Sequence, residues 1–346
     1  MSLVKAAIHA FEDAPVPDMV ARKAIDMLVG DARRRLSRAP TDASLLFARA
    51  MERHPIATHT DEANAQHYEL PAAFFEAVLG PHLKYSSALY PPGATKLEHA
   101  EAEALRETCL HADLRDGQDV LELGCGWGSL SLWMAERYPS SRIVSVSNSA
   151  SQRAFIMARA AQRGLANLTV VTADMNDFDT TRRFDRVVSV EMFEHMSNWR
   201  ALLTRVRDWL KSDGRLFLHV FTHRTTPYRF EADDPADWIA QYFFSGGVMP
   251  SHDLAGQFPD LFAVEADWRW SGQHYARTAR QWLENFDANR ARIDPVLAEV
   301  YGPRAAIWRR RWRLFFLATA GLFGHRGGQE WGVSHYRLRP VSESVR

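Results

Sequence analysis

Two carboxylates and an imidazole stand within five residues of one another in Glu191-Met-Phe-Glu-His195, directly after an apolar segment that is predicted to be a buried strand. Charged groups in such a place are costly to desolvate unless they are paired or take part in chemistry. If a helical turn starts here, Glu191 shares one face with Glu194 and with His195. Acidic groups that only cap a helix are the alternative. We expect these three residues to form a reaction centre.

A glycine turn is the second unusual feature, with Gly124, Gly126 and Gly128 on alternate positions after Glu122. The apolar run before it predicts a strand, and residues 129–138 predict a helix. Glycine permits positive φ and lets a ligand lie against the main chain. A carboxylate here repels a pyrophosphate but attracts an amino-acid ammonium. The spacing resembles motif I of class I S-adenosylmethionine (SAM) methyltransferases, which implies a SAM site; an ordinary tight turn is the alternative.

Polar residues also follow the next two predicted strands. Ser147, Asn148 and Gln152 come after the second strand, and Asn148 and Gln152 can hydrogen-bond a ribose or a methionine moiety. After the third strand, Asp174 can accept a hydrogen bond from an adenine amino group, and the Met175 thioether can pack on the adenine face. Simple solvation in a loop is the alternative for Asp174. We expect all five residues to belong to the cofactor site.

These residues must be positioned by an α/β fold, because strand and helix patterns alternate after the glycine turn. The expected fold is that of the class I SAM methyltransferases, a Rossmann-like, mostly parallel sheet of seven strands with helices on both faces. Such a sheet binds ligands at the carboxyl ends of its strands. The predicted strands span residues 120–123, 142–147, 168–172, 184–190, 215–221, 263–270 and 332–339.

Two domains are expected. Residues 1–95 form a helical N-terminal cap, and residues 96–346 form the SAM-dependent methyltransferase domain. Within the second domain, an aromatic-rich insertion at about 222–261 and C-terminal helices at about 278–323 are expected to form a lid over the substrate. The remaining predicted helices span residues 18–36, 43–53, 97–111, 150–161, 201–210, 278–299 and 305–323, and a further helix is broken near Pro71. A turn is predicted at 211–214.

Composition agrees with a cytoplasmic enzyme. The chain has 346 residues, of which 46% are hydrophobic and 24% charged, so it can bury a full core. Lys+Arg (42) and Asp+Glu (42) balance, which leaves no net field to hold nucleic acid. The two cysteines, Cys109 and Cys125, favour a reducing compartment. The N-terminus has no signal-peptide pattern, and the longest apolar run, 314–323, is about half a membrane span.

Motifs spread along the chain resemble the cyclopropane fatty acid synthase superfamily of SAM methyltransferases, and within it most closely the coclaurine N-methyltransferase branch. The resemblance runs from about residue 64 to the C-terminus and adds Tyr85, Ser86 and Glu191 to the expected cofactor contacts. The matching motifs are Tyr85-Ser86, E-L-G-C-G-W-G-S (122–129), N-S-x-S-Q (148–152), E-M-F-E-H-M (191–196), Y-F-F-S-G-G-x-M-P-S (242–251), H-Y-A-R-T (274–278) and Glu330-Trp331.

The resemblance implies two versions of the reaction centre. Cyclopropane synthases hold a bicarbonate base with a Cys, a Glu, a His and a Tyr, and the matching positions are Ser87, Glu194, His219 and Tyr275. One ligand has changed, so the bicarbonate site stays open. The coclaurine-type enzymes rely on the Glu and His of E-M-F-E-H, and that whole motif matches. The synthases tend to have a smaller residue where Glu191 stands, which favours the amine enzyme.

Methyl transfer to an amine sets clear requirements. It is an in-line displacement with the reacting atoms about 3 Å apart. An alkylamine, with a pKa of about 10 as for lysine, is mostly protonated at neutral pH and has no lone pair to attack with. An imidazole, or a carboxylate whose pKa is raised by burial, can accept the proton. We therefore expect Glu191 and Glu194 to anchor the amine and His195 to act as the base, with His219 and Tyr275 as further catalytic candidates.

Aromatic side chains could build a cation–π box or an acyl tunnel around the substrate. We expect most of them to be core residues and only two or three to touch substrate. The candidates are Phe193, Phe221, Tyr242, Phe243, Phe244, Trp268, Trp270 and Trp282.

Three functions remain open. The preferred one is SAM-dependent N-methylation of a small aromatic or isoquinoline-like amine, with S-adenosylhomocysteine (SAH) as the product. The alternative is a cyclopropane fatty acid synthase or fatty-acyl C-methyltransferase acting on unsaturated phospholipids; bicarbonate and membrane contact, through the basic stretch 309–313, follow only in that case. A SAM-binding scaffold without catalysis is the third. A homodimer is left open, and neither a metal nor a nucleic acid is expected.

Overall fold

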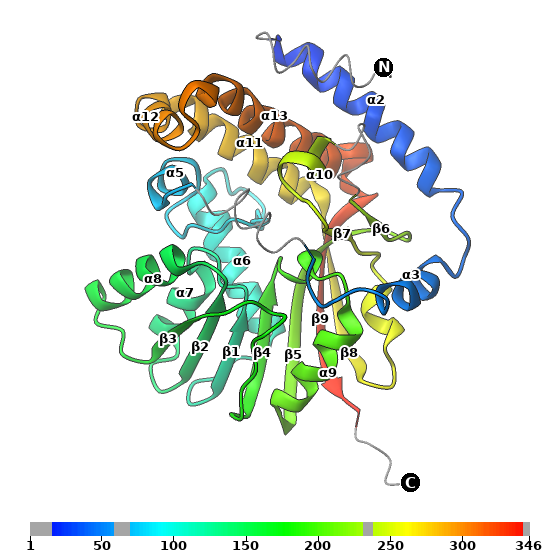
Figure 1. Ribbon diagram of the computed structural model, residues 1–346, viewed down its shortest axis with the longest axis vertical. Coiled ribbons are helices and arrows are strands. Elements are labelled where there is room, and N and C mark those ends of the chain that lie inside the picture. The colour runs from blue at the N-terminus through cyan, green and yellow to red at the C-terminus, as the bar shows by residue number, and fades with distance from the viewer. Residues whose placement is uncertain (1–15, 59–69, 231–237, 342–346) are drawn as a thin grey trace.

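The computed structural model describes residues 16–58, 70–230 and 238–341. Seven strands form one sheet in the order β3-β2-β1-β4-β5-β9-β8 (Figure 1). Strands β1 to β5 run parallel, whereas β9 is antiparallel to both of its neighbours, β5 and β8. The strands are β1 (Asp119–Leu123), β2 (Arg142–Ser147), β3 (Leu168–Thr172), β4 (Phe184–Val190), β5 (Leu210–His223), β8 (Phe262–Ser271) and β9 (Trp331–Pro340). The expected Rossmann-like fold is confirmed.

Helices cover both faces of this sheet and one of its ends. A second, two-stranded sheet pairs β6 (Tyr228–Arg229) with β7 (Val248–Met249). The α-helices are α2 (Asp18–Leu36), α3 (Ala43–Met51), α5 (Ala72–Val78), α6 (Leu97–His111), α7 (Ser129–Arg137), α8 (Ala150–Gln162), α9 (Trp199–Trp209), α10 (Trp238–Tyr242), α11 (Gly272–Ala288), α12 (Arg290–Tyr301) and α13 (Ala305–Gly324). Short 3-10 helices are η1 (Phe193–His195), η2 (Leu254–Gln257), η3 (Gly302–Arg304) and η4 (His325–Gly328).

The central strands are apolar on both sides because helices pack on both faces. On β1, Val120 packs into a cluster with α6, α7 and α8, whereas Leu121 and Leu123 pack on the opposite face with α3 and α9. Glu122 lies on the α6–α8 side between these apolar residues. The alternation of side chains along a strand therefore directs the acid of the glycine motif into the packed layer of α7.

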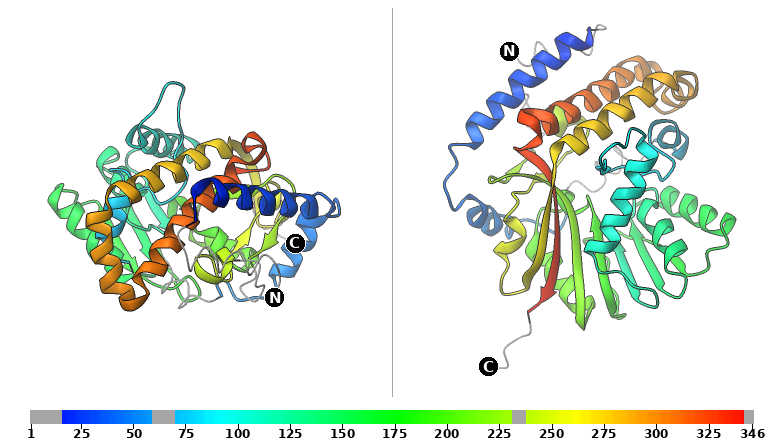
Figure 2. Two further views of the ribbon diagram at one scale, coloured as in Figure 1. Left: turned by 90° about the horizontal axis from the view of Figure 1, so that it is seen from above. Right: turned by 180° about the vertical axis from the view of Figure 1, so that it is seen from behind.

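A third apolar cluster lies above the carboxyl ends of the parallel strands. It joins α2, α5, α11, α12 and α13 and includes Trp282 and Trp312. Both views of Figure 2 show α11 and α13 crossing this end of the sheet, with α2 laid over α13. Ligands of a parallel sheet bind at the carboxyl strand ends, so this helical layer faces the expected site.

The helices of the expected N-terminal cap are distributed over the molecule. Helix α2 packs on α13, α3 packs on α9 and η2, and α5 packs on α11 and α12. The part of the predicted broken helix at residues 63–69, and the first residues of the motif resemblance, lie outside the described residues. The division of the chain at residue 95 stays a prediction.

Three local predictions were wrong. The turn predicted at 211–214 is part of β5, which begins at Leu210 and absorbs the extra residues in a bulge opposite Phe184. The predicted helix 278–299 is two helices, α11 and α12, because the helical geometry breaks at Asn289.

The third correction concerns the predicted reaction centre. Glu191 does not start a helical turn: its φ is +48°, and only Phe193–His195 form a 3-10 turn. The Glu191 N–H donates to the carbonyl oxygen of His219 (2.8 Å), so the residue still follows the strand pairing of β4 with β5. Glu191 therefore does not share a helix face with Glu194 or His195, and its side chain takes its partners from the sheet and from α11.

Candidate active site

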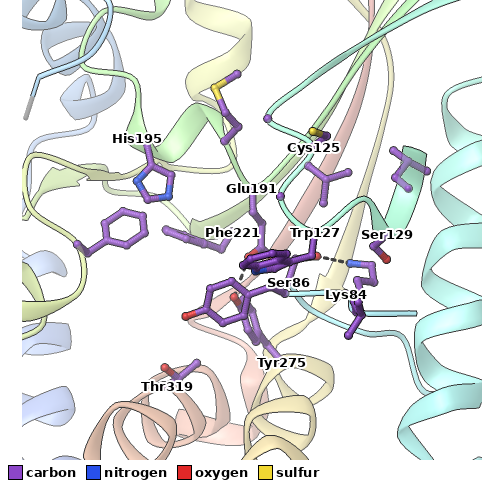
Figure 3. Close-up of a pocket in the computed structure, with 18 of the residues that line it drawn as sticks. Lys84, Ser86, Cys125, Trp127, Ser129, Glu191, His195, Phe221, Tyr275 and Thr319 are labelled. Atoms are coloured by element: carbon purple, nitrogen blue, oxygen red, sulfur yellow. Dashed lines mark hydrogen bonds between the residues drawn. The ribbon is translucent and has the colours of Figure 1, made fainter. Parts of the chain in front are cut away.

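A cavity of about 180 Å³ lies between the carboxyl ends of the central strands and helices α11 and α13 (Figure 3). A smaller chamber of about 70 Å³ adjoins it beyond the ends of β2 and β3. Five residues border both spaces: Gly124, Gly126, Gln152, Met192 and His195. We call the larger space the inner chamber and the smaller one the outer chamber.

Two of the glycines of the turn, Gly126 and Gly128, are needed for different reasons. At Gly126 (φ +50°) an added Cβ would meet no atom within 4 Å, and this residue borders both chambers. At Gly128 (φ +80°) a Cβ would lie 2.6 Å from Cγ1 of Ile156. Gly128 is not among the residues that line either chamber, so it serves the packing of α7 against α8. Only part of the glycine motif therefore gives a ligand access to the main chain.

Glu122 borders the inner chamber and is buried. Its Oε2 accepts hydrogen bonds from the hydroxyls of Ser131 on α7 and Ser145 on β2 (2.7 Å for Ser145). Burial raises the pKa of this carboxyl, and the two hydroxyls partly offset that effect. A carboxylate fixed in this way can attract the ammonium of an amino acid at the glycine turn.

The inner chamber also carries hydrogen-bond donors that lack a partner among the described residues. They are Trp127 Nε1, Ser129 Oγ and Gln152 Nε2, each from a residue of the chamber wall. Buried donors are normally paired, so this group fits a ligand that brings acceptors, such as a carboxylate or a ribose. The amino-acid end of SAM has this chemistry.

Lys84 is a cation of the inner chamber that the sequence reasoning missed. Its Nζ is buried and donates to Ser86 Oγ (2.5 Å) and to the carbonyl oxygen of Ser87 (2.7 Å). Burial lowers its pKa to about 8, against the opposing effect of Glu191 and Glu101. Its position directly before the Tyr85-Ser86 motif was the available signal, because that motif was already expected at the cofactor. Tyr85 and Ser86 line the same chamber.

The outer chamber collects the residues expected at the ribose and the adenine. Ser147, Asn148, Asp174 and Met175 all line it, at the ends of β2 and β3. The Ser147 hydroxyl donates to Gln152 Oε1 (2.7 Å), which fixes the amide between the two chambers. The structure thus brings these residues together around one space next to the glycine turn.

Glu191 is the best-connected acid of the inner chamber. Its Oε1 accepts from the Ser87 N–H (3.0 Å) and lies 3.2 Å from His219 Nε2, while its Oε2 accepts from the Tyr275 hydroxyl (2.7 Å). Burial raises the pKa of this carboxyl, and the Lys84 cation and the hydrogen bonds act in the opposite direction. A carboxyl with a raised pKa next to a cavity can exchange a proton with a bound ligand.

Glu194 and His195 lie differently from Glu191. His195 borders both chambers and packs on the Phe244 ring (4.3 Å between centroids), and burial lowers its pKa to about 4. Glu194 is fully buried and lines neither chamber; its Oε1 accepts from the Phe221 N–H (2.6 Å), and its Oε2 has no partner among the described residues. Burial and then Glu191 raise the pKa of Glu194. His219 also lies behind the wall and reaches the chamber only through Glu191.

The far wall of the inner chamber is apolar. Of the eight aromatic residues considered from the sequence, Phe221, Phe244 and Trp282 line it. That only two or three of the eight touch the substrate stays a prediction. The other five lie elsewhere. The remaining large apolar residues of this wall come from the insertion and from α13: Phe230, Ile239, Met249, Phe315, Leu322 and Phe323.

Two further observations concern metal ions and membranes. In the described part of the chain, no group of three or more His, Cys, Asp or Glu residues is arranged to hold a metal ion. Among the same residues, every helix is too short or too polar to cross a bilayer.

A Rossmann-like sheet with an acid-and-glycine turn and these two chambers defines a SAM-dependent methyltransferase. Residues 57–328 match the mycolic acid cyclopropane synthetase family, and the chain belongs to that family.

Similar proteins within and around this family include both types of enzyme considered above. The chain is 37% identical over 285 residues to an (S)-coclaurine N-methyltransferase of Thalictrum flavum subsp. glaucum, covering 81% of this chain and 79% of that protein. It is 34% identical over 270 residues to a cyclopropane-fatty-acyl-phospholipid synthase of Escherichia coli (strain K12), covering 78% and 66%.

Among solved structures, a coclaurine N-methyltransferase bound to N-methylheliamine and SAH is similar over nearly the whole chain. The TM-score is 0.93 at 31% identity, with 98% of this chain and all of the other covered. SAM is accordingly the cofactor of this enzyme, and its similarity to the coclaurine enzyme extends beyond the sheet to the helical layer that closes the inner chamber.

Proposed function

We propose that this enzyme transfers the methyl group of SAM to the nitrogen of a small aromatic or isoquinoline-like amine. One observation carries the proposal: Glu191 presents a buried carboxyl to the inner chamber, whose far wall is built from aromatic and aliphatic side chains. A flat, cationic ligand needs both features, an apolar wall to cover its rings and an acid to receive its ammonium. The coclaurine N-methyltransferases support the same substrate class.

The proposed cofactor residues divide between the two chambers. Asp174 and Met175 would receive the adenine, Ser147, Asn148 and Gln152 the ribose, and Glu122 the amino-acid ammonium. Tyr85, Ser86, Gly124 and Gly126 would complete that site, with Lys84 and Ser129 near the carboxylate. Bound SAM supplies the methyl group from its sulfonium.

The chain's own residues must hold the amine and remove its proton. Glu191 attracts the ammonium into the chamber, and either Glu191 or the neutral imidazole of His195 accepts the proton so that the nitrogen lone pair is free. Tyr275 and His219 fix the Glu191 carboxylate from two sides. Glu194 holds the end of β5 through the Phe221 N–H, so we assign it a positioning role in place of a direct contact with the amine.

The arrangement around Glu191 speaks against a bicarbonate-dependent lipid enzyme. His219 and Tyr275, which the family resemblance assigns to a bicarbonate, both contact the Glu191 carboxylate, and so does the main chain of Ser87. The protein thus provides its own carboxylate at that place.

The basic stretch 309–313 is largely engaged within the protein. Arg313 pairs with Asp18 (2.6 Å) and with Asp287 (2.7 Å), and Arg309 pairs with Asp294 (3.2 Å). Arg311 lies over the Tyr242 ring (3.7 Å). These contacts support a structural role for the stretch in place of a lipid-binding one.

The test is SAH formation from a panel of aryl-ethylamines, isoquinolines and vesicles of unsaturated phospholipid. We expect amines to consume SAM at a rate that does not change when bicarbonate is removed. SAH formed only with vesicles, and only with bicarbonate present, would refute the proposal. A variant sharpens the test: Glu191→Gly should lose activity and regain part of it with added bicarbonate or formate, because a small carboxylate can then bind between His219 and Tyr275.

A further inference from the structure

Three histidines connect Glu191 to the surface in one unbroken chain of contacts. Glu191 Oε1 lies 3.2 Å from His219 Nε2, and His219 Nδ1 lies 2.8 Å from His335 Nε2. His335 Nδ1 lies 2.8 Å from His111 Nδ1, and His111 Nε2 lies 3.1 Å from Glu107 Oε2. Each imidazole uses both of its nitrogens, one toward the active site and one toward the surface. This is the arrangement through which a proton can be handed along.

Strand pairing, burial and ring stacking fix the positions of these three rings. His219 and His335 are directly opposed on the antiparallel strands β5 and β9, and both are fully buried. His111 is the last residue of α6, one helical turn after Glu107, and the Trp268 ring stacks on it at 3.8 Å between centroids. The Glu107 side chain is 18% exposed. The chain therefore begins at the inner chamber and ends in contact with solvent.

We propose that His219, His335 and His111 form a proton relay that carries the proton of the bound amine from Glu191 to Glu107 at the surface. The proposal rests on the proposed N-methyltransferase activity, which releases one proton for each methyl group transferred. The amine nitrogen loses that proton to Glu191, its lone pair forms the new N–CH₃ bond, and the electron pair of the broken S–CH₃ bond stays on sulfur.

One proton can pass along the relay while each of the three imidazoles stays neutral before and after the transfer. Before transfer, protonated Glu191 donates to His219 Nε2, His219 Nδ1–H donates to His335 Nε2, His335 Nδ1–H donates to His111 Nδ1, and His111 Nε2–H donates to the Glu107 carboxylate. Each proton then crosses its own hydrogen bond, which leaves Glu191 ionised and Glu107 protonated beside solvent. The transfer leaves each ring in its other tautomer, and Glu107 gives its proton to water. The starting tautomers return when a proton from water at Glu107 passes back along the same hydrogen bonds to Glu191, which releases it to water through the chamber after the product has left.

The charged groups around the relay favour neutral imidazoles. Burial lowers the pKa of His111 to about 4, helped by Arg337 and Arg106, and burial also lowers the pKa of His219 and His335, helped by Lys84 and by the other histidines. Arg337 comes from β9, Arg106 from α6, and Lys84 precedes the Tyr85-Ser86 motif. Trp268 and Trp270 of β8 pack on the rings without adding charge. A relay of neutral rings needs no stable imidazolium, which these surroundings would oppose.

The first experiment does not depend on turnover. The protonation of Glu191 is followed by its carboxylic-acid infrared band, identified by its loss in Glu191→Gln, after a pH jump on the SAH-bound enzyme. We expect His111→Gln, which breaks the relay far from the chamber, to slow this protonation at least tenfold. Added imidazole should restore the rate. His223→Gln, a buried histidine of the same strand β5 that is outside the relay, should match the wild type.

The second experiment uses the amine that the panel identifies. We expect His111→Gln to lower kcat about tenfold, with the KM of the amine and the affinity for SAH unchanged, and with a larger solvent isotope effect on kcat. An unchanged pH-jump rate in His111→Gln would overturn the relay, and so would a loss of kcat that imidazole does not rescue and that accompanies a lower Tm. If no amine is methylated while the pH-jump result holds, the proposed function fails and the relay stands.

Discussion

The outer and inner chambers are adjacent, yet they are built in different ways. The outer chamber takes its predicted residues from the ends of β2 and β3, two successive βα units that follow the glycine turn. The inner chamber adds residues from the insertion, from α11 and from α13, up to 200 residues further along the chain. The residues predicted for the cofactor at the ends of β2 and β3 thus come from a short stretch of sequence, whereas the apolar wall of the inner chamber depends on how distant segments pack. Changes in the two chambers should therefore affect different kinetic constants.

The largest difference between the effect on kcat and the effect on cofactor affinity is expected for Glu191→Gln in the inner chamber. The amide cannot accept the proton of the amine, so kcat should fall about 10²- to 10⁴-fold, the range typical of a lost general base. The affinity for SAH should change less than kcat does, because Gln keeps the shape of Glu191 and the residues of the outer chamber are unchanged. Rates and SAH titration calorimetry check this, with exposed Glu98→Gln as the control. A loss of SAH affinity as large as the loss of kcat would show that the two chambers are not separable.

A smaller effect in the inner chamber, on the KM of the amine, is expected for Phe244→Leu. Phe244 lines the inner chamber and packs on His195 and Phe221, so losing the ring removes aromatic contact with the acceptor. The KM of the amine should rise up to about tenfold, since a ring contact contributes up to about 1.5 kcal/mol. The KM of SAM should stay near that of the wild type. Phe178→Leu, which removes a ring packed on Trp209 away from both chambers, should lower Tm without raising either KM.

On the cofactor side, Asp174→Asn should raise the KM of SAM about fivefold. The Asn amide oxygen can still accept from the adenine amino group but carries no charge, and exchanging a charge-assisted hydrogen bond for a neutral one costs on the order of 1 kcal/mol. The KM of the amine should not move. Asp177→Asn, an exposed position on the same loop, is the matched control. Equal effects of the two substitutions would remove Asp174 from the cofactor site.

Acid should lower the free energy of unfolding, and this is the smallest of the predicted effects. Burial lowers the pKa of His195, His111 and His223 to about 4, so below pH 6.5 the unfolded chain binds protons that the folded chain does not. The free energy of unfolding should therefore fall as the pH drops from about 6.5 toward 4. Glu101 has the opposite sign: burial raises its pKa to about 7, so its contribution is lost as the pH rises through 7.

Thermal unfolding measured at several pH values checks this balance. We expect Tm to decrease from pH 7 to pH 5, and to decrease less in His223→Gln, which removes one of the three histidines. A Tm that rises steadily on acidification would mean that the buried carboxyls with a raised pKa, Glu101 among them, outweigh the histidines.

Much of the fold followed from the sequence. The predicted limits of β2, β3, β4, α2 and α6 agree with the structure to the residue, because each has a regular apolar pattern bounded by glycine, proline or polar residues. The limits of β5 were missed, since the bulge opposite Phe184 keeps residues 211–214 in the strand although Asp213-Gly214 has the composition of a turn. A bulge depends on the neighbouring strand, which a local pattern does not describe.

The sequence by itself determined which polar residues gather around the outer chamber, because the residues after β2 and β3 lie where the backbone of a βα unit must put them. Only the tertiary structure decided what Glu191 contacts. Its partners Ser87, Tyr275 and His219 stand 104, 84 and 28 residues away, and the left-handed conformation at Glu191 directs the carboxylate to them. The histidine chain behind it has the same origin, since His111, His219 and His335 meet only when a helix end packs on a pair of antiparallel strands. Hydrogen bonds and burial act through space, and their partners are fixed only when the chain has folded.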